Sequence, residues 1–452
     1  MRILLAQNMF HLPTHGGANK SNRILMEQLA ARGHECHVVA PMSGALRQTS
    51  LDRHLSYLEG LGAAIRSVSA ESVTYEHEGV VAHAVVSPSR LAREVGAVAA
   101  ALDPSWTLVP SDDPGMIMLG AASRATPGRV VYLAHTLQQL PFGPGAFYPS
   151  AAGTRLVKAA AGVVAVSRAA RDHLREWGPI ESELIYPQVY GDPVTVTVTV
   201  TVTGPGPGSG SGSGSGDEGA VTMVNPCAYK GLPIFLALAD ARPDTSFLAV
   251  PTWGATGADL DALHSRPNIR LVEPADDIGV ILAMTKVLVM PSLWDETFGY
   301  TAVEAMLRGI PVLASDVGGL SEAKLGVPYL LPVRPITEYE AGAHARPVPV
   351  VPEQDARPWA EALDRLLSDP GHRRELGRLS REAATSFVAS LDEGALERYL
   401  GELTPAPATP AADRPRARAL TPERRAALAA RLAVHAAPPP PGTVPDQGDH
   451  SS

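Results

Sequence analysis

The sequence predicts an α/β protein built from two Rossmann-like domains, each a doubly wound parallel sheet, that face a central cleft. Three observations predict this class. Strand-like and helix-like segments alternate over residues 1–190, the same alternation resumes at residue 220, and a low-complexity stretch separates the two regions. Such alternation is typical of parallel sheets with helices on both faces. Ligands bind such sheets at the carboxyl ends of the strands, so we expect the site in the cleft.

The first region opens on a short apolar strand, RILLA at 2–6, and continues into a helix over 17–32 that Gly33 ends. No small-residue cleavage site follows the opening run, so we interpret it as a strand and not as a signal peptide. The later elements expected here are strands at 36–40, 106–110, 129–134 and 162–166 and a hairpin at 72–86. The segments 42–68, 136–155 and 112–115 are interpreted as loops.

The second region repeats the pattern and ends in helices. Strands are expected at 221–224, 246–250, 269–272, 286–290 and 311–314, and helices at 232–241, 277–284 and 299–308. The Pro- and Val-rich segment 341–356 is interpreted as a loop insertion, and two helices are expected near 357–368 and 371–401. The predicted boundaries are a domain at 1–190, a linker at 191–219, a domain at 220–385, a final helix at 386–402 and a mostly disordered, Pro- and Ala-rich tail at 403–452.

Composition excludes several classes of protein. The net charge is −9 and no large basic patch is present, which argues against nucleic acid as the main partner. No run of 18 apolar residues appears, so a transmembrane segment is not expected. The two cysteines, Cys36 and Cys227, cannot build a disulfide framework, and we therefore expect a cytoplasmic protein. The Ala- and Pro-rich, aliphatic composition is typical of a bacterium with GC-rich DNA.

The most informative segment is 294–322, WDETFGYTAVEAMLRGIPVLASDVGGLSE. Glu296 is followed by Glu304 after seven residues, and a helix is expected to begin near Gly299 between them. The first N–H groups of a helix are unpaired and attract anions, so this start is a natural seat for a diphosphate. The two carboxylates can accept hydrogen bonds from sugar hydroxyls on either side. The alternative is a surface helix on which Glu304 is only solvated.

This segment resembles the Glu-x7-Glu signature of the family 4 retaining glycosyltransferases, which have the GT-B fold. The match extends to Phe298-Gly299, Glu304-Ala305-Met306, Gly309, Pro311-Val312, Gly318-Gly319 and Glu322. The resemblance implies that Glu296 holds hydroxyls of the donor sugar, with help from the backbone at Phe298 and Gly299. It further implies that Glu304 holds the ribose of the nucleotide and that the backbone near Tyr300 and Thr301 holds the diphosphate.

Further matches are spread over nearly the whole of residues 1–400. The His15-Gly16-Gly17 turn matches the family loop that faces the donor across the cleft, although a plain tight turn explains it about as well. His135 ends an expected strand and resembles the active-site histidine that contacts the donor sugar; the alternative is a structural histidine. Ser167 matches a strand-Ser-helix step. Gln188 and Tyr190 depart from the usual exit motif into the linker.

The segment VNPCAYKGL resembles the family segment whose basic pair binds the donor phosphates. Lys230 with Gly231 matches it, but Asn225 stands where the family often has arginine. Lysine is a point charge and arginine a bidentate ligand, so the usual clamp of two cations is in doubt here. We expect Lys230 to act on the leaving diphosphate and Asn225 to line the donor site. The alternative is that Lys230 is a solvated surface residue.

Three further clusters contain acidic or metal-ligating residue types. His34, Cys36 and His37 are close in sequence, but on a strand His37 points away from the other two, and a fourth ligand is lacking. Asp259 and Asp261 fall in an expected helix and are interpreted as surface residues. The pair Asp112-Asp113 follows a strand. It either reaches the acceptor hydroxyl or forms a turn before Pro114, and both alternatives stay open.

The resemblance implies a function: transfer of a sugar from a nucleotide-sugar donor to a hydroxyl acceptor with retention at the anomeric carbon. It implies an acceptor-binding first domain, a nucleotide-sugar-binding second domain, a final helix that crosses back to the first, and no metal or other cofactor. The acceptor would be a small natural product or a glycolipid, with peripheral membrane contact possible for the latter. The alternatives are a nucleotide-sugar-binding protein without turnover, and a GT-B epimerase or phosphorylase.

Overall fold

The structure is a computed structural model that describes residues 1–14, 16–43, 49–190, 219–341 and 347–406. These residues belong to one compact unit, Met1–Pro407. Almost all of the predicted linker, 191–218, and most of the predicted tail, 407–452, lie outside the described residues, so these two domain boundaries stay predictions. The described part contains two large sheets, as the alternating pattern predicts.

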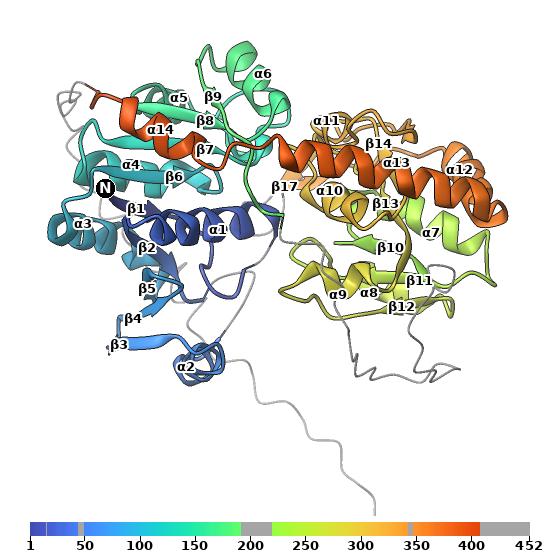
Figure 1. Cartoon of the computed structure of the whole chain (residues 1–452), viewed down its shortest axis with the longest axis horizontal. Helices are drawn as coiled ribbons and strands as arrows, with labels where there is room; N and C mark the ends of the chain where they lie inside the picture. Colours follow the sequence, from blue (N-terminus) through green and yellow to red (C-terminus); the bar gives the residue numbers. More distant parts are fainter. Residues whose placement is uncertain (15, 44–48, 191–218, 342–346, 407–452) are drawn as a thin grey trace, which may run out of the picture. The chain divides into compact units, whose positions relative to one another are not determined.

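Within the described residues, the first sheet has nine strands in the order β3-β4-β5-β2-β1-β6-β7-β8-β9 (Figure 1). Its strands are β1 (Arg2–Ala6), β2 (Glu35–Pro41), β3 (Ala64–Val68), β4 (Ser72–His77), β5 (Val80–Val85), β6 (Trp106–Pro110), β7 (Val130–Ala134), β8 (Gly162–Ala165) and β9 (Glu183–Leu184). All neighbours are parallel except β3-β4 and β4-β5, which are antiparallel. The expected hairpin at 72–86 is therefore confirmed.

Successive residues of β1 alternate between the two faces of this sheet. Ile3 and Leu5 lie in one buried cluster and Leu4 in another. This alternation is the period of two that a strand imposes, and burial on both faces explains why the strand is a continuous apolar run. The helices of this half are α1 (Gly17–Ala31), α2 (Leu51–Gly60), α3 (Leu91–Leu102), α4 (Ile117–Ala125), α5 (Ala151–Lys158) and α6 (Arg168–Trp177).

The segment 42–68 is not the loop that the sequence pattern predicts. It contains α2, whose N-cap Ser50 accepts a hydrogen bond from the Arg53 N–H (3.3 Å), and the edge strand β3. The pattern was missed because β3 is largely exposed and α2 buries only His54 and Leu58. A helix or strand that buries so few residues shows only a weak hydrophobic periodicity in its sequence.

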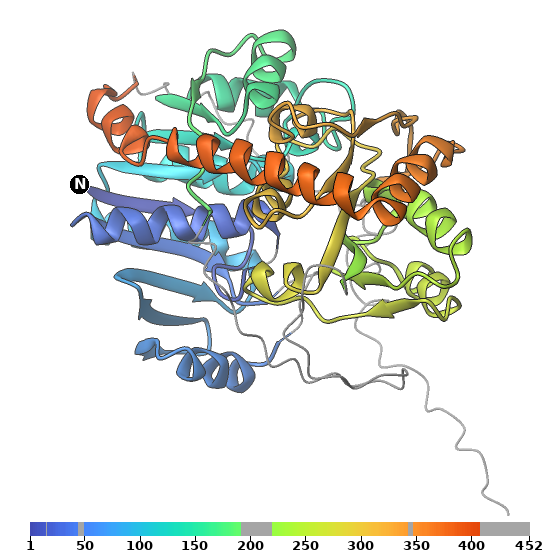
Figure 2. The same cartoon turned by 45° about the vertical axis from the view of Figure 1, so that its right-hand side comes forward.

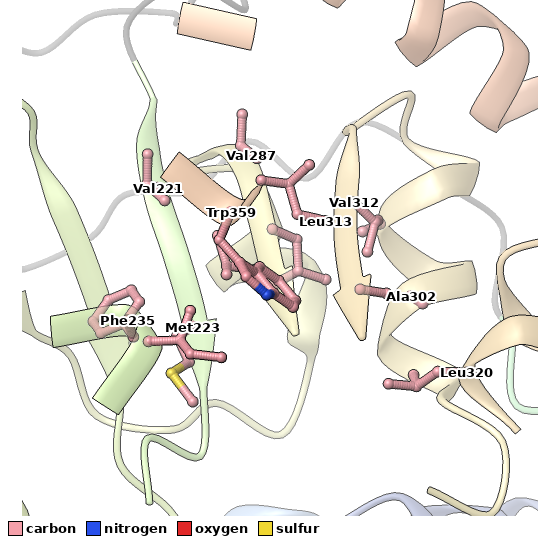
Figure 3. Packing of buried hydrophobic residues seen from close by; sticks show 14 of the residues in the cluster. Val221, Met223, Phe235, Val287, Ala302, Val312, Leu313, Leu320 and Trp359 are labelled. Carbon is pink, nitrogen blue, oxygen red and sulfur yellow. The ribbon is translucent and has the colours of Figure 1, made fainter. Parts of the chain in front are cut away.

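The second sheet is fully parallel, with the order β12-β11-β10-β13-β14-β15 among the described residues. Its strands are β10 (Ala220–Val224), β11 (Phe247–Val250), β12 (Ile269–Leu271), β13 (Thr285–Met290), β14 (Val312–Ser315) and β15 (Leu330–Leu331). Its helices are α7 (Leu232–Asp240), α8 (Gly257–His264), α9 (Ile278–Leu282), α10 (Tyr300–Leu307), α11 (Leu320–Ala323), α12 (Arg357–Ser368) and α13 (Pro370–Ala389). Trp359 of α12 is fully buried in the same cluster as Val221 and Leu313 (Figure 3).

Two expectations about the end of the chain were wrong. The segment 341–356 is not only a loop, because β16 (Tyr339–Ala341) and β17 (Pro347–Pro349) pair in an antiparallel two-stranded sheet. Proline is tolerated in an edge pair of this kind, so a Pro-rich pattern conceals it. The single helix expected at 371–401 is two helices, α13 and α14 (Ala395–Glu402), and a loop separates them (Figure 2).

Helix α14 packs against the first sheet. Leu396 and Leu400 lie in the buried cluster that contains Ile3 and Trp106, and the indole N–H of Trp106 donates to the Leu400 carbonyl (2.9 Å). Helix α13 instead packs against α10 and α12 (Figure 1). The sequence predicts that segment 386–402 crosses back to the first sheet. The helix that reaches this sheet begins only at Ala395.

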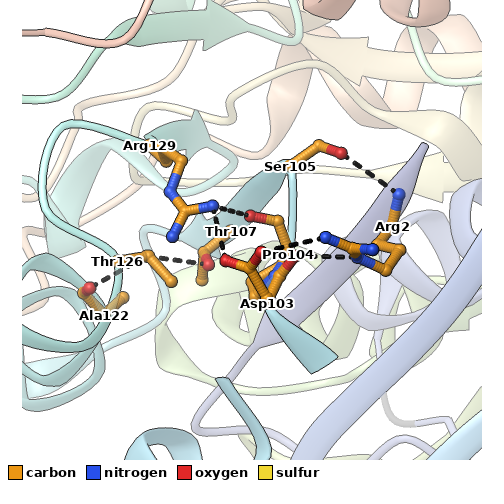
Figure 4. Close-up of polar contacts among 8 residues, drawn as sticks. All are labelled: Arg2, Asp103, Pro104, Ser105, Thr107, Ala122, Thr126 and Arg129. Carbon is orange, nitrogen blue, oxygen red and sulfur yellow. Dashed lines mark hydrogen bonds and ion pairs between the residues drawn. The ribbon is translucent and has the colours of Figure 1, made fainter. Parts of the chain in front are cut away.

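The amino ends of β1, β6 and β7, which we call the amino edge, are held by paired polar groups (Figure 4). The Asp103 carboxylate accepts hydrogen bonds from Arg2 and Arg129, each at 3.0 Å. Beside them, the buried Thr126 hydroxyl donates to the Ala122 carbonyl (3.0 Å) and hydrogen-bonds with the Thr107 hydroxyl (2.9 Å). These contacts tie the start of three neighbouring strands together.

Two further sequence expectations concern the whole chain. Cys36 and Cys227 are both free and buried. In the described part of the chain, no helix combines the length and the apolar character that a membrane span needs. The cytoplasmic location stays a prediction.

Candidate active site

The loop between β13 and α10 places Glu296 in a nest of hydrogen-bond donors. Its Oε1 atom accepts hydrogen bonds from Lys230 Nζ, from the Ser292 hydroxyl and from the Trp294 indole N–H, the last at 3.1 Å. Burial alone would raise the pKa of Glu296, but Lys230 and these hydrogen bonds hold it below its ordinary value. Among the described residues no donor reaches Oε2, so an ionised carboxylate keeps one oxygen free.

Lys230 follows β10 and ends a short 3-10 turn, Ala228–Lys230. Its ammonium group pairs with Glu296 and lies 4.8 Å from the centre of a Trp294 ring. Gly231 follows with φ +81°, and a Cβ atom there would lie 1.9 Å from the Pro291 carbonyl oxygen. Glycine is therefore required for the chain to bring Lys230 next to the Glu296 loop.

Asn225, the residue that stands in place of an arginine, is buried and has a left-handed backbone with φ 59°. Its Oδ1 atom accepts a hydrogen bond from the Gly254 N–H (3.0 Å), which fixes the orientation of the amide. Its Nδ2 group is buried and has no partner among the described residues. Asn225 therefore offers a neutral donor where the family pattern has a cation.

The glycines of the Glu296 segment have a steric role. A Cβ atom at Gly299, where φ is +121°, would lie 2.7 Å from a Leu320 methyl carbon, and one at Gly318 would lie 2.4 Å from the Glu296 carbonyl oxygen. The Gly319 N–H donates to that same carbonyl (2.6 Å). The Gly318-Gly319 pair thus clamps the loop that carries Glu296, while Gly299 leads into α10 without a side-chain cap.

Glu304 lies on α10 with its side chain 8% exposed and pairs with Lys20 of α1 (Nζ to Oε1, 2.5 Å). Burial raises the pKa of Glu304, and Lys20 opposes that shift. The pair borders a cavity of about 280 Å³ that Arg23, Tyr190 and Arg308 also line. The sequence contained no signal for Lys20, since a lone lysine on a helix is usually solvated.

The carboxyl ends of β6 and β7, which we call the carboxyl edge of the first sheet, hold His135. The Ser111 hydroxyl accepts hydrogen bonds from the N–H groups of His135 and Thr136, both at 3.0 Å. The His135 ring is buried, and neither of its nitrogens has a partner in the described part of the chain. Burial lowers the pKa of His135 to about 4, so the imidazole is neutral near pH 7.

Asp112 and Asp113 have different hydrogen-bond partners. The Asp113 carboxylate accepts hydrogen bonds from the N–H groups of Met118 (3.0 Å) and Leu119 (2.9 Å) at the start of α4, which is a structural role. Asp112 Oδ1 accepts a hydrogen bond from the Thr136 hydroxyl (2.8 Å), but Oδ2 is buried without a partner among the described residues. Burial raises the pKa of Asp112 to about 6.

The Gly16-Gly17 turn lies against the second half of the site. A Cβ atom at Gly17 would lie 2.8 Å from the Tyr300 ring, and one at Gly16, where φ is +90°, would lie 3.8 Å from the Trp253 ring. A plain tight turn would not need this closeness, so the contact favours the interpretation that the loop faces the donor side. His15 lies outside the described residues.

Other site residues gain structural roles that the sequence did not indicate. Ser167 caps α6 by accepting the Ala170 N–H (3.0 Å), and its hydroxyl donates to the Thr297 carbonyl (2.5 Å). Glu322 accepts hydrogen bonds from the Arg168 N–H and the Tyr186 hydroxyl. The sequence match singled out Ser167 and Glu322 without explaining them.

The remaining site residues lie close to these groups. Phe298 is buried, with its ring 5.6 Å from that of Tyr300. Thr301 follows Tyr300 in the first turn of α10. The structure therefore gathers Lys230, Glu296, Phe298 and the start of α10 in one place.

The clusters judged not to be sites have other partners. His34 precedes β2 and contacts the N-terminal amine (2.8 Å) and Glu397 (2.9 Å). Cys36 is buried in the core, and the His37 ring stacks on His83. Asp259 forms a capping box with Thr256 at the start of α8.

Two family models match the chain in succession. Residues 15–189 match the Glycosyltransferase Family 4 model, and residues 229–369 match the model of glycosyl transferases group 1. The chain belongs to the family 4 glycosyltransferases and has the GT-B fold. The two matches cover both sheets except β1 and β10, and they include every predicted site residue of the second half except Asn225.

Solved structures with this fold are similar over most of the glycosyltransferase. Sucrose-phosphate synthase from Thermosynechococcus elongatus has a TM-score of 0.60 at 19% identity, covering 88% of this chain and 99% of that one. Anabaena HepE in complex with UDP-glucose has a TM-score of 0.59 at 16% identity, covering 89% of this chain and 98% of that one. At such identities the likeness shows the fold alone.

Curated relatives match a shorter part of the glycosyltransferase. The D-inositol 3-phosphate glycosyltransferase of Pseudarthrobacter chlorophenolicus is 32% identical over 142 residues, 29% of each chain. That of Corynebacterium diphtheriae is 28% identical over 189 residues, 38% of this chain and 40% of the relative. The match thus spans well under half the length of these relatives.

Proposed function

We propose that this protein transfers a sugar from a nucleotide-sugar donor to a hydroxyl group of an acceptor, with retention of configuration at the anomeric carbon. One observation carries the proposal. Two buried carboxylates, Glu296 and Glu304, flank an uncapped helix start, and each has one oxygen held by a lysine and one that accepts no hydrogen bond among the described residues. A ligand that carries hydroxyls on both sides of a diphosphate fits this arrangement.

Donor binding follows from these groups. The Glu296 Oε2 atom would accept a hydrogen bond from a sugar hydroxyl, and the N–H groups at the start of α10 would hold the diphosphate. Lys230 would exchange part of its contact with Glu296 for a phosphate oxygen. Glu304 would accept a ribose hydroxyl, which requires Lys20 to share or release this carboxylate. His135, neutral at pH 7, would complete the sugar site from the first sheet.

The reaction breaks the bond between the anomeric carbon and the diphosphate oxygen, and the electron pair leaves with the diphosphate. The acceptor oxygen forms a new bond to the same face of that carbon, and its proton passes to the leaving phosphate oxygen. Stabilisation of the leaving charge by Lys230 and the α10 N–H groups is the main catalytic effect in this scheme. We assign Glu296 to hydroxyl binding and not to attack on carbon, because its lowered pKa and its ion pair make it a weak nucleophile. The scheme uses no metal or other cofactor.

The similar proteins suggest the first substrates to test. The HepE structure is titled as a complex with UDP-glucose, and the curated relatives are named for D-inositol 3-phosphate. UDP-glucose is therefore the first donor in a panel of nucleotide sugars, and polyols are the first acceptors. Small molecules and glycolipids both stay within the proposed acceptor class.

Release of nucleoside diphosphate from this panel tests the proposal, and the anomeric coupling constant of the product, measured by NMR, tests retention. We expect release above the rate of hydrolysis with one donor and an axial-to-axial or equatorial-to-equatorial outcome. The Glu296→Gln variant should lose most turnover, whereas Asp261→Asn, an exposed carboxylate of the same half, should not. Binding of nucleotide sugars with no release from any of them would identify a binding protein instead, and an inverted product would contradict retention.

A further inference from the structure

The carboxyl edge of the first sheet contains a carboxylate that the fold does not use. Asp112 follows β6, and the Thr136 hydroxyl after β7 holds its Oδ1 atom at 2.8 Å. The Oδ2 atom is buried and accepts no hydrogen bond in the described part of the chain. A buried carboxylate oxygen without a partner destabilises the folded state, so a native protein that keeps one calls for an explanation.

The neighbouring residue shows what a structural aspartate looks like at this place. Asp113 uses both of its oxygens to accept N–H groups of α4. Asp112 caps no helix and forms no ion pair with a lysine or arginine among the described residues. The two aspartates are adjacent in sequence, so the difference between them is one of role.

Asp112 and His135 lie at the carboxyl ends of two neighbouring strands, β6 and β7. The next strand end carries His135, whose buried ring nitrogens are also unpartnered, and the Ser111 hydroxyl fixes the backbone of His135 and Thr136. Burial raises the pKa of Tyr300, the first residue of α10, and the charge of Asp112 adds to that shift. Asp112 therefore lies within electrostatic reach of the position where the diphosphate is expected.

The charge around this position is negative. Asp113 is the adjacent charged group, and it disfavours a second negative charge at Asp112. An ionised carboxylate can only accept hydrogen bonds, so it binds a hydroxyl or an ammonium group and repels a phosphate. A ligand hydroxyl on Oδ2 would supply the partner that the fold leaves out.

We propose that Asp112 binds the acceptor, and that it selects a hydroxyl compound that is neutral or amine-bearing and excludes a phosphorylated one. This inference rests on the proposed function and adds the charge class of the acceptor to it. Asp112 acts here as a specificity-determining residue: Thr136 orients its carboxylate, and Oδ2 accepts a hydrogen bond from the acceptor. The relatives named for an inositol phosphate would then differ from this protein in the acceptor that they use.

Acceptors in matched sets test the inference. Each set holds a hydroxyl compound and its phosphate ester: inositol with inositol 3-phosphate, and glucose with glucose 6-phosphate. The glucose set also holds the amino analogue glucosamine. Nucleoside diphosphate release is measured above hydrolysis for the wild-type protein, Asp112→Asn and Asp113→Asn. The same compounds are added to the nucleoside-diphosphate-loaded protein in a thermal-shift assay, which reports binding without turnover.

We expect the wild-type protein to prefer the unphosphorylated member of a set by at least about tenfold in kcat/KM. Asp112→Asn should lose most of that preference and should not weaken the binding of nucleoside diphosphate. It should also keep or raise the Tm at pH 7.5, because it removes an unpaired buried charge. Asp113→Asn should lower the Tm, because it weakens the cap of α4.

Preference for a phosphate ester, or full acceptor efficiency in Asp112→Asn, would overturn the inference. If the wild-type protein turns over no donor, the proposed function fails, and the thermal shift alone decides the inference. Stabilisation by a polyol or amino polyol that Asp112→Asn abolishes would then support a binding site of the stated class. A larger shift with the ester, or no shift with any compound, would contradict it.

Discussion

The two ends of the first sheet use polar residues in opposite ways. At the amino edge, Asp103 holds two arginines and the buried Thr126 hydroxyl has both Thr107 and a carbonyl as partners (Figure 4). At the carboxyl edge of the same strands, the His135 ring and one oxygen of Asp112 are buried with no partner among the described residues. The named polar groups of the amino edge have their hydrogen-bond partners within the protein. Those of the carboxyl edge lack partners among the described residues.

The comparison teaches where to look for a function in this fold. Paired groups stabilise the folded state by themselves, and buried unpaired groups weaken it. Natural proteins retain such destabilising groups at sites where a bound ligand supplies the missing hydrogen-bond partners. In this protein the second sheet follows the same rule. The Asn225 amide, in the loop after β10 that also leads to Lys230, is buried with a donor that has no partner among the described residues.

The largest effect on turnover is expected from replacing Lys230. Replacing it by alanine removes the cation that we propose stabilises the leaving diphosphate, and the neutral Asn225 cannot take over its charge. We expect kcat to fall by about a hundredfold or more, as for other groups that stabilise a leaving charge. The measurement is nucleoside diphosphate release with the preferred donor, and Lys158→Ala, an exposed lysine of α5, is the matched control. Near wild-type turnover in Lys230→Ala would place the phosphate site elsewhere.

The next effect concerns His135 and has two parts. Its pKa of about 4 lies below the ordinary value of 6.5, so the neutral ring stabilises the fold above pH 6.5 and this contribution is lost as the pH falls toward 4. The loss amounts to at most about 3 kcal/mol. His135→Asn should therefore flatten the dependence of unfolding free energy on pH over that range, and lower turnover at pH 7.5 by about tenfold.

Urea unfolding at several pH values measures the first part of the His135 prediction, and nucleoside diphosphate release measures the second. His11 and His83 have lowered pKa values as well, so the variant flattens only a share of the dependence. A variant with full turnover and an unchanged pH dependence would remove His135 from the site and break the comparison.

The smallest effect is expected at the amino edge. Thr107→Val removes the hydroxyl that hydrogen-bonds with Thr126, which still donates to the Ala122 carbonyl. The free energy of unfolding should fall by about 1 kcal/mol, with kcat and KM unchanged. Urea unfolding and donor turnover are measured on the same preparation. A marked loss of turnover without a loss of stability would show that the two edges are not separated as the comparison states.

Much of the fold could be predicted, because its central strands are buried on both faces. Apolar runs such as RILLA and the helix that follows it have a clear period, and the structure has both. The elements missed were those that bury little, such as β3, or those that Pro conceals, such as β17. The hydrophobic pattern of a segment is weak where contacts with distant parts of the chain stabilise it.

The candidate site was predictable where a motif fixes the backbone. Close contacts require glycine at Gly299 and at the Gly318-Gly319 pair. The spacing of these glycines in the sequence therefore indicates where Glu296 lies in the loop. Lys20 was not predictable, because its partner Glu304 lies 284 residues away and no motif links the two. The division of roles between Asp112 and Asp113 was also beyond the sequence, since it depends on which of the two reaches the N–H groups of α4.

The central claim is that the open carboxylates around α10 bind the donor and that each holds a different part of it. Calorimetric titration of nucleoside diphosphate into Glu304→Gln and Glu296→Gln tests this claim most directly. We predict that the Kd rises at least about tenfold in Glu304→Gln, a loss of about 1.4 kcal/mol, because the ribose loses its acceptor. In Glu296→Gln it should stay close to wild type, because nucleoside diphosphate lacks the donor sugar. Equal Kd values in the two variants would contradict the account.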